Sequence, residues 1–158
     1  MASSASRFVL LGVLGLPVLI AAAVFGPAVL DLTFHRRSPE RFLIPAGYMG
    51  WVKVEFRKAS TPPLATEDGR RVLRVGTDGT LQTSSDPHSG HGDDEFFYYR
   101  GAERVHLPNA GVCKGGMIWG LETLVDERSS TPFTRFFVGT EAQYRHEVDP
   151  AGKSAACE

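Results

Sequence analysis

Residues 50–57 read GWVKVEFR, and this stretch decides the fold class. The apolar side chains of Val52, Val54 and Phe56 alternate with charged ones. Successive side chains of a strand point to opposite sides, so a period of two is typical of a strand with one buried and one solvated face. The stretch therefore predicts a half-buried strand, which the turn-forming residues 60–63, STPP, bring to an end.

Further strands are predicted along the chain. Residues 70–75 and 81–85 flank Asp78-Gly79, a dipeptide typical of tight turns, and we expect these two segments to pair as a hairpin. Residues 95–100, EFFYYR, are apolar on both faces, which predicts a central strand. A second hairpin should join them to residues 103–107, where apolar and polar side chains alternate.

The C-terminal part predicts two more strands and a helix. Residues 117–121 and 134–138 have the composition of short strands. Thr140 and Gln143 fit a capping box, which predicts a short helix over residues 141–147. Short strands separated by Gly/Pro turns indicate a mainly β domain, a small β-sandwich or barrel-like fold with a short C-terminal helix.

The N-terminal region has a different character. Residues 8–30 contain no charged side chain, and as a helix they would extend about 34 Å, against about 30 Å for the hydrocarbon core of a bilayer. They predict a transmembrane or signal-anchor helix. Residues 31–44 are interpreted as a juncture, because Pro39 and Pro45 disfavour helix there.

The expected organisation is therefore an anchor or signal segment at residues 1–37, a β-rich domain at 38–150 and a mobile tail at 151–158. The first segment could also be a secretory signal peptide, since Arg7 gives a basic start and residues 21–23, AAA, a small-residue exit. Cleavage would make the domain a secreted one. The length of the apolar run favours an uncleaved anchor.

The sequence carries opposing signals about the side of the membrane on which the β domain lies. Arg36, Arg37 and Arg41 follow the apolar run, and the positive-inside rule would keep them in the cytoplasm. The signal-like start and the composition of the β domain favour export, and large domains cross membranes despite flanking charge. We expect the domain on the extracytoplasmic side of the cytoplasmic membrane.

Charge and motif content exclude several classes of function. Without Arg7, Arg36, Arg37 and Asp31, the chain beyond residue 37 keeps 14 basic and 17 acidic residues, a net charge of −3. It has no basic stripe interleaved with aromatics, so nucleic acid is not an expected partner. It also has no phosphate-binding glycine loop, CxxC pair or GxSxG motif. We expect a non-enzymatic domain without a cofactor, which contacts the membrane through residues 8–30 and binds an envelope protein or ligand.

The two cysteines, Cys113 and Cys157, are the minimum for one disulfide. An exported domain would permit the bond, and two free thiols are the alternative. No cysteine follows the apolar run at residues 8–30. A bacterial lipoprotein carries its lipid on a cysteine at that place, so lipid attachment is not expected.

Residues 44–52, IPAGYMGWV, resemble the opening of a bacterial family of unknown function with small lipoproteins or membrane-anchored proteins as members. Other segments resemble later parts of the same family: Pro62-Pro63, Glu67-Asp68-Gly69, Thr83-Ser84-Ser85, residues 96–99 and Phe137-Val138-Gly139-Thr140. The resemblance covers about residues 42–146. It implies an exported, envelope-associated β domain and implies no activity.

Two groups of residues are candidates for a site. Tyr48 and Trp51, in the opening segment, each combine an apolar body with one polar group, so they either cover the end of the fold or face a ligand. The second group, in a polar run at residues 86–95, has nitrogen and oxygen donors that suit zinc or another divalent ion: His88, His91, Asp93 and Asp94. It predicts either a metal-binding protein or metal-dependent envelope enzyme, or only a solvated loop.

Overall fold

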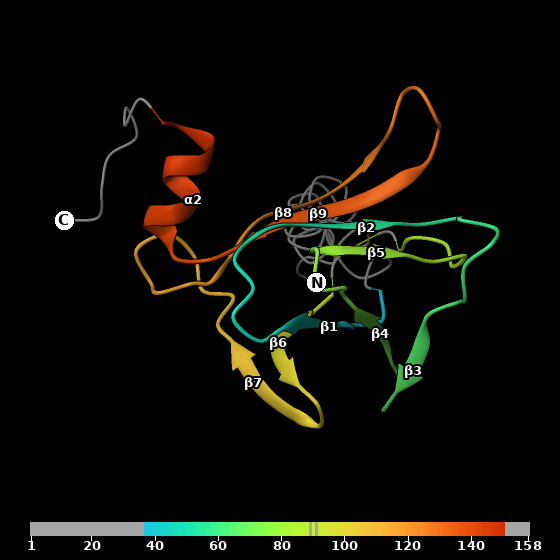
Figure 1. Cartoon of the computed structure of the whole chain (residues 1–158), viewed down its shortest axis with the longest axis horizontal. Coiled ribbons are helices and arrows are strands. Elements are labelled where there is room, and N and C mark those ends of the chain that lie inside the picture. The colour runs from blue at the N-terminus through green and yellow to red at the C-terminus, as the bar shows by residue number, and fades with distance from the viewer. Residues whose placement is uncertain (1–36, 89, 91, 151–158) are drawn as a thin grey trace, which may run out of the picture. The chain divides into compact units, whose positions relative to one another are not determined.

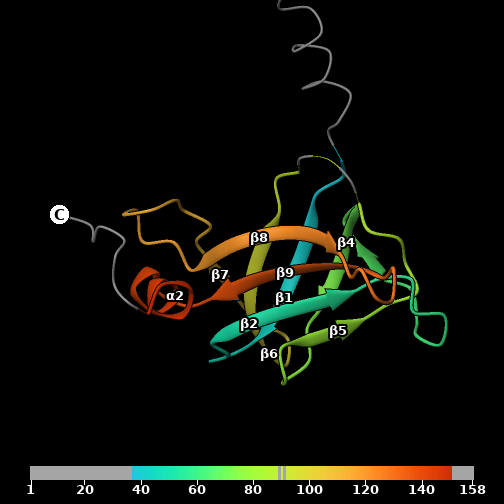
Figure 2. The same cartoon turned by 90° about the horizontal axis from the view of Figure 1, so that it is seen from above.

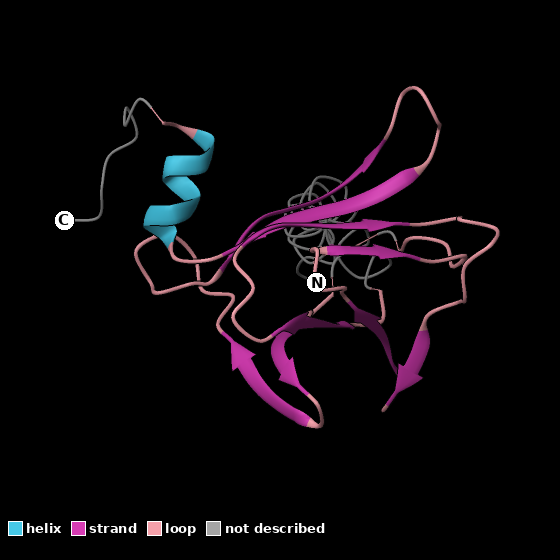
Figure 3. Ribbon diagram, in the orientation of Figure 1, coloured by secondary structure: helices cyan, strands magenta, loops and turns pink. Residues whose placement is uncertain are grey.

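The computed structural model describes residues 37–88, 90 and 92–150. This part of the chain forms nine strands and one helix (Figure 3). The elements are β1 (Glu40–Pro45), β2 (Gly50–Glu55), β3 (Ala65–Glu67), β4 (Arg70–Arg74), β5 (Thr80–Gln82), β6 (Glu95–Arg100), β7 (Glu103–Leu107), β8 (Ile118–Val125), β9 (Pro132–Val138) and α2 (Glu141–Val148).

The strands form two mixed sheets, which Figures 1 and 2 show as two layers. The five-stranded sheet has the order β3-β4-β1-β6-β7, and the four-stranded sheet has the order β5-β2-β9-β8. Strand β1 runs parallel to both β4 and β6, and β2 runs parallel to β5. The prediction of a mainly β domain with a short C-terminal helix is confirmed.

One apolar core lies between the two sheets. The rings of Phe42 and Phe96 stack in the five-stranded sheet with centroids 4.9 Å apart, and Phe136 of the four-stranded sheet meets both edge-on. Val52 and Val54 of β2 are fully buried in the same core. The alternation read in residues 50–57 is therefore confirmed, and the buried face of β2 is the one expected.

Strand β1 corrects the prediction of a juncture at residues 31–44. Phe42, Leu43 and Ile44 are all buried, because β1 lies in the middle of its sheet between two parallel neighbours. Such a strand has no polar face and shows no alternation. Asp94 fixes its start by accepting a hydrogen bond of 2.9 Å from the Glu40 backbone N–H.

The prediction that the segments before and after Asp78-Gly79 pair as a hairpin is wrong. The turn itself forms, with Asp78 Oδ1 accepting from the Thr80 N–H at 3.0 Å. However, β4 lies in one sheet and β5 in the other, where β5 pairs with β2. Turn residues reverse the chain locally, but they do not determine which strand the following residues will join.

The other local predictions hold. Strands β6 and β7 pair antiparallel as the expected hairpin, with Tyr98 opposite Val105. The capping box is present, since the Gln143 side chain accepts from the Thr140 N–H at 2.8 Å and Thr140 Oγ1 accepts from the Gln143 N–H. The helix begins at Glu141, as the sequence indicates, and continues to Val148.

Among the described residues, no helix has the length and apolar character needed to cross a bilayer. The predicted anchor at residues 8–30 and the predicted mobile tail at residues 151–158 both lie outside the described residues.

Candidate functional site

Tyr48 lies in the turn between β1 and β2, and its polar groups are engaged there. Its hydroxyl donates to the backbone carbonyl of Trp51, while its own carbonyl accepts from the Tyr98 hydroxyl at 2.7 Å. Burial raises the pKa of Tyr48, and the charge of the Asp78 carboxylate raises it further. The hydroxyl therefore remains a donor. Gly79 has φ +80°, and a Cβ there would come within 2.8 Å of the Trp51 carbonyl oxygen. The turn between β1 and β2 fixes the start of β2 and thereby the position of Trp51.

Trp51 belongs to a line of three rings on the outer face of the four-stranded sheet. The register places Phe137 of β9 opposite both Trp51 of β2 and Trp119 of β8. The Trp51 and Phe137 rings meet edge to face at 5.7 Å. We call these three side chains the aromatic row. They come from three neighbouring strands, so the sheet holds them in a fixed order.

The helix α2 places the ring of Tyr144 against the aromatic row. Its ring stacks on Trp119 with centroids 5.9 Å apart, and lies 5.8 Å from Phe137 and 6.2 Å from Trp51. Figures 1 and 2 both show α2 at the end of the four-stranded sheet, beyond the C-terminal end of β9.

A surface groove of about 550 Å³ lies beside the row. Its lining comes from the start of β2, the end of β9 and one side of α2: Met49, Gly50, Phe137, Ala142, Gln143, His146 and Glu147. The Met49 side chain is 60 % exposed, and its sulfur accepts a hydrogen bond from the Gln143 amide at 3.3 Å. A lining that combines apolar side chains with a few polar groups is typical of binding sites.

Beyond the row, two cations on this outer face lie over aromatic rings and pair with carboxylates. The Arg135 guanidinium lies over the Trp51 ring at 5.4 Å and contacts Glu122 at 2.6 Å. The Lys53 ammonium lies over the Phe133 ring at 5.0 Å and contacts Glu55 at 3.0 Å. The hydrogen bond from Lys53 is the largest effect lowering the pKa of Glu55.

The outer face of the five-stranded sheet is closed over by side chains. Its two edge strands are joined, since Arg104 of β7 makes two hydrogen bonds of 2.8 and 3.1 Å to Glu67 of β3. A flat sheet would hold these strands about 19 Å apart, so the contact requires strong curvature. Figure 1 shows β3 and β7 bending to the same side, away from the four-stranded sheet. Beneath this bridge, Arg41 is only 13 % exposed and pairs with Glu95 at 3.0 Å.

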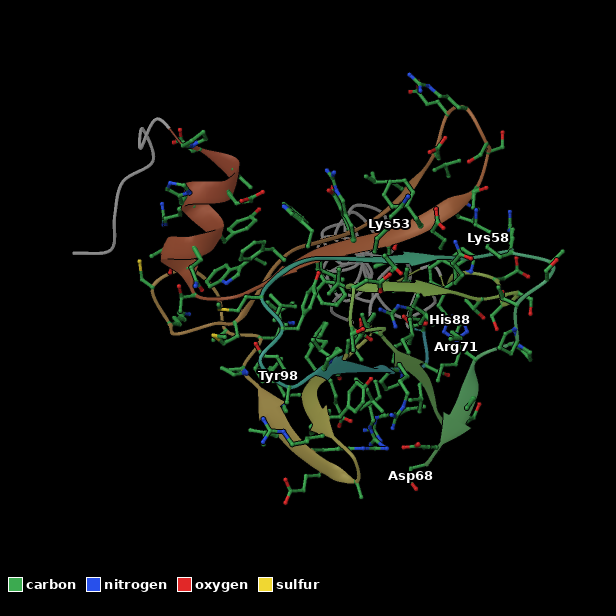
Figure 4. The ribbon with its side chains drawn as sticks, in the orientation of Figure 1. Lys53, Lys58, Asp68, Arg71, His88 and Tyr98 are labelled. Carbon is green, nitrogen blue, oxygen red and sulfur yellow. The ribbon has the colours of Figure 1, made fainter. Side chains whose placement is uncertain are left out.

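Two of the predicted metal ligands lie around Glu40. The His88 Nδ1 atom is 3.7 Å from Glu40 Oε1, and Asp94 accepts from the Glu40 N–H. Figure 4 shows His88 beside Arg71, whose guanidinium lies 3.0 Å from the same Glu40 oxygen. The side chains of His88 and Asp94 therefore hold the loop before β6 against the start of β1.

The other two residues of the predicted metal set are Asp93 and His91. Asp93 is exposed, and His91 lies outside the described residues. Within the described ranges, no group of three or more His, Cys, Asp or Glu side chains could hold a metal ion. The metal site stays a prediction.

Cys113 lies exposed in the loop between β7 and β8, next to the start of α2. Its backbone N–H donates to Glu141 Oε2 at 2.7 Å. This bond, followed by the contact with Arg145, lowers the pKa of Glu141. The predicted partner, Cys157, lies outside the described residues, so the disulfide also stays a prediction.

The sequence interpretation identified Trp51 as a candidate but missed Trp119 and Tyr144. Tyr144 sits within a helix that was recognised by its capping box, and only the fold shows that its ring lies on the row. Phe137 was noted as part of a family segment, and no local signal indicated its role in the row.

Comparisons with known proteins concern the fold and the family. No curated protein matches the chain. A crystal structure of a candidate lipoprotein from Bacillus anthracis is similar, with a TM-score of 0.53, 19% identity, and coverage of 65% of this chain and 71% of that one. At this identity the similarity shows a shared fold. The model of a family of unknown function, DUF6843, matches residues 36–147. The resemblance read from the sequence is thus confirmed, and the chain belongs to the DUF6843 family.

Proposed function

We propose that this protein is a non-enzymatic envelope domain that binds another envelope protein through the groove beside the aromatic row. The two sheets would act as a β-sandwich scaffold that holds this groove at one end. The observation that carries the proposal is the groove itself, which is lined by an exposed Met49, by Phe137 of the aromatic row and by residues of α2.

Exposed apolar side chains around α2 support a protein partner. Met49 contacts Gln143 of α2, Val112 precedes Cys113, whose N–H binds Glu141, and Val148 ends the helix. These three side chains are 51–60 % exposed. A concentration of exposed apolar side chains with polar groups at the rim is typical of protein interaction sites.

The membrane location is part of the proposal. Residues 8–30 would anchor the chain, with the β domain on the extracytoplasmic side, or the domain would be secreted after cleavage. The similar fold of the candidate lipoprotein supports an envelope location. A reporter that is active only after export, fused after residue 158, should be active, and a reporter that is active only in the cytoplasm should not. The reverse pattern would mean that Arg36, Arg37 and Arg41 retain the domain inside.

Photo-crosslinking in living cells tests the groove. A photoreactive residue replacing Met49 should give a discrete adduct with one protein. The matched control is Val105 on β7, an apolar side chain of similar exposure, 65 % against 60 %, at the edge of the five-stranded sheet. Equal adducts from both positions, or none from position 49, would contradict the proposed function.

A further inference from the structure

The three rings of the aromatic row pack around the ring of Tyr144. Trp51, Phe137 and Trp119 form three sides of contact around one ring, that of Tyr144. Stacking at 5.9 Å on one side and edge contacts on another are the geometries that aromatic pairs prefer. The site therefore recognises a ring by shape as well as by apolar area.

The helix that carries Tyr144 is short and lies at the surface. It has eight residues, and none of them is buried. An isolated helix of that length is unstable in water, so its stability depends on contacts with the domain. Besides the Tyr144 ring, three of its contacts lie near its first turn: the Thr140 capping box, the Gln143–Met49 bond and the bond from the Cys113 N–H to Glu141.

The aromatic row does not depend on α2 for its own geometry. The Trp119 indole N–H donates to the Gly139 carbonyl at 2.8 Å, and the Gly139 N–H donates to the Met117 carbonyl at 3.0 Å. Both bonds join the row to the end of β9, before the helix begins. If α2 moved away, the chain would pivot after Gly139 and the three rings would keep their positions.

The site has room for a phenol hydroxyl in particular. Gly120 in the irregular part of β8 has φ +61°, and a Cβ on this residue would come within 2.9 Å of the Tyr144 hydroxyl oxygen. The missing side chain leaves the space that the hydroxyl occupies. Phe137 also lines the groove, so the ring site and the groove are continuous.

We infer that α2 is a displaceable cover and that the aromatic row is a receptor for a tyrosine side chain of the partner protein, which takes the place of Tyr144. This inference rests on the proposed function and names the chemistry that the partner must offer. The adjoining groove would then receive the residues next to that tyrosine. Displacement would also be reversible, because Tyr144 remains tethered to the domain and competes for the same site.

Tryptophan fluorescence tests the receptor without a partner, since the only two tryptophans of the chain, Trp51 and Trp119, both lie in the row. In the full-length chain in detergent, Tyr144→Ala should raise quenching by acrylamide. Added 4-methylphenol, the side chain of tyrosine, should return quenching to the wild-type level in a saturable manner. Phe133→Ala is the matched control, because it removes a ring from the same face without touching Tyr144. No effect of 4-methylphenol on Tyr144→Ala, or the same effect on Phe133→Ala, would overturn the receptor.

Thr140→Ala tests the cover, because it removes the helix cap and leaves every ring in place. We expect the docking equilibrium of α2 to shift by about fivefold, seen as increased quenching with an unchanged far-UV spectrum of the β domain. In cells, the same change should increase the adduct from position 49. Increased quenching without any adduct would retain the cover and reject the proposed function. Quenching at the wild-type level would overturn the cover.

Discussion

The outer faces of the two sheets are covered in opposite ways. On the five-stranded sheet, Leu43 points outward from β1 and is still fully buried, although it is not part of the core between the sheets. On the four-stranded sheet, Leu124 of β8 also lies outward, opposite Phe133, and is 36 % exposed. One face is sealed by the curvature of its own sheet and the ion pair of Arg104 with Glu67. The other is covered by a short helix only over the aromatic row, at one end of the sheet.

The difference indicates where function can reside. A face sealed by side chains of its own strands cannot open without loss of the sheet, so its residues serve stability. The aromatic row on the other face is covered by an eight-residue helix without buried residues, and the strands beneath this helix pair with each other without it. This contrast fits a structural role for the Arg41 and Arg104 region and the binding role that we propose for the aromatic row.

The largest expected effect compares the same substitution on the two faces. Leu43→Ala should destabilise the domain by about 2–5 kcal/mol, since it leaves a cavity under the charged bridge. Leu124→Ala should cost under about 1 kcal/mol, because that side chain is already partly in water. Urea unfolding of both variants measures the two values. Equal losses of unfolding free energy in the two variants would contradict the difference between the two outer faces.

The predicted disulfide would restrain α2, the helix that covers the aromatic row. A bond between Cys113 and Cys157 closes a loop of about 45 residues around α2 and would contribute up to about 4 kcal/mol. Intact mass after alkylation should show no added group on the native exported protein and two after reduction. Two groups added without reductant would establish free thiols. If the bond is present and restrains α2, reduction should also increase the quenching of the tryptophans by acrylamide.

A smaller effect concerns the ion pair that closes the five-stranded sheet. Hydrogen bonding and charge from Arg104 lower the pKa of Glu67, so this contribution to stability exists above the unfolded-state pKa of a glutamate and is lost as the pH falls through the lowered value. Arg104→Gln should therefore be less stable than the wild type at pH 7, with the difference shrinking in acid. Unfolding curves at several pH values check this. A difference that stays constant with pH would assign the effect to packing.

The smallest expected effect is on metal content. We expect full-length protein to carry less than about 0.1 equivalent of zinc or another divalent ion, and His88→Ala with His91→Ala to leave this value unchanged. Elemental analysis measures it. Stoichiometric metal lost in the double variant would restore the metal site as a function of this loop. The contact of His88 with Glu40 predicts instead a modest loss of thermal stability in His88→Ala.

Local patterns in the sequence predicted local structure well. Alternation identified β2, the aromatic run EFFYYR identified β6, and Thr140 with Gln143 identified the start of α2. Each of these depends on residues a few positions apart. Pairing between distant strands was beyond reach, which is why β1 was missed and β5 was given the wrong partner.

The candidate site was predictable only in part, for the same reason. Trp51 could be singled out because it lies in a distinctive segment. Trp119 and Tyr144 are 68 and 93 positions further along the chain, and only the register of β8 with β9 and the direction of α2 bring them together. Tyr48, equally prominent in the sequence, is occupied by hydrogen bonds within its own turn.

The central position of β1 has a mechanical consequence. This strand is the first of the domain, it begins at Glu40, and it is hydrogen-bonded on both sides to parallel neighbours. A pull on the preceding chain, directed along the strand, would load the two ladders together in shear instead of opening one bond at a time. A pull from the N-terminal side would thus act first on a strand that is held by neighbours on both sides.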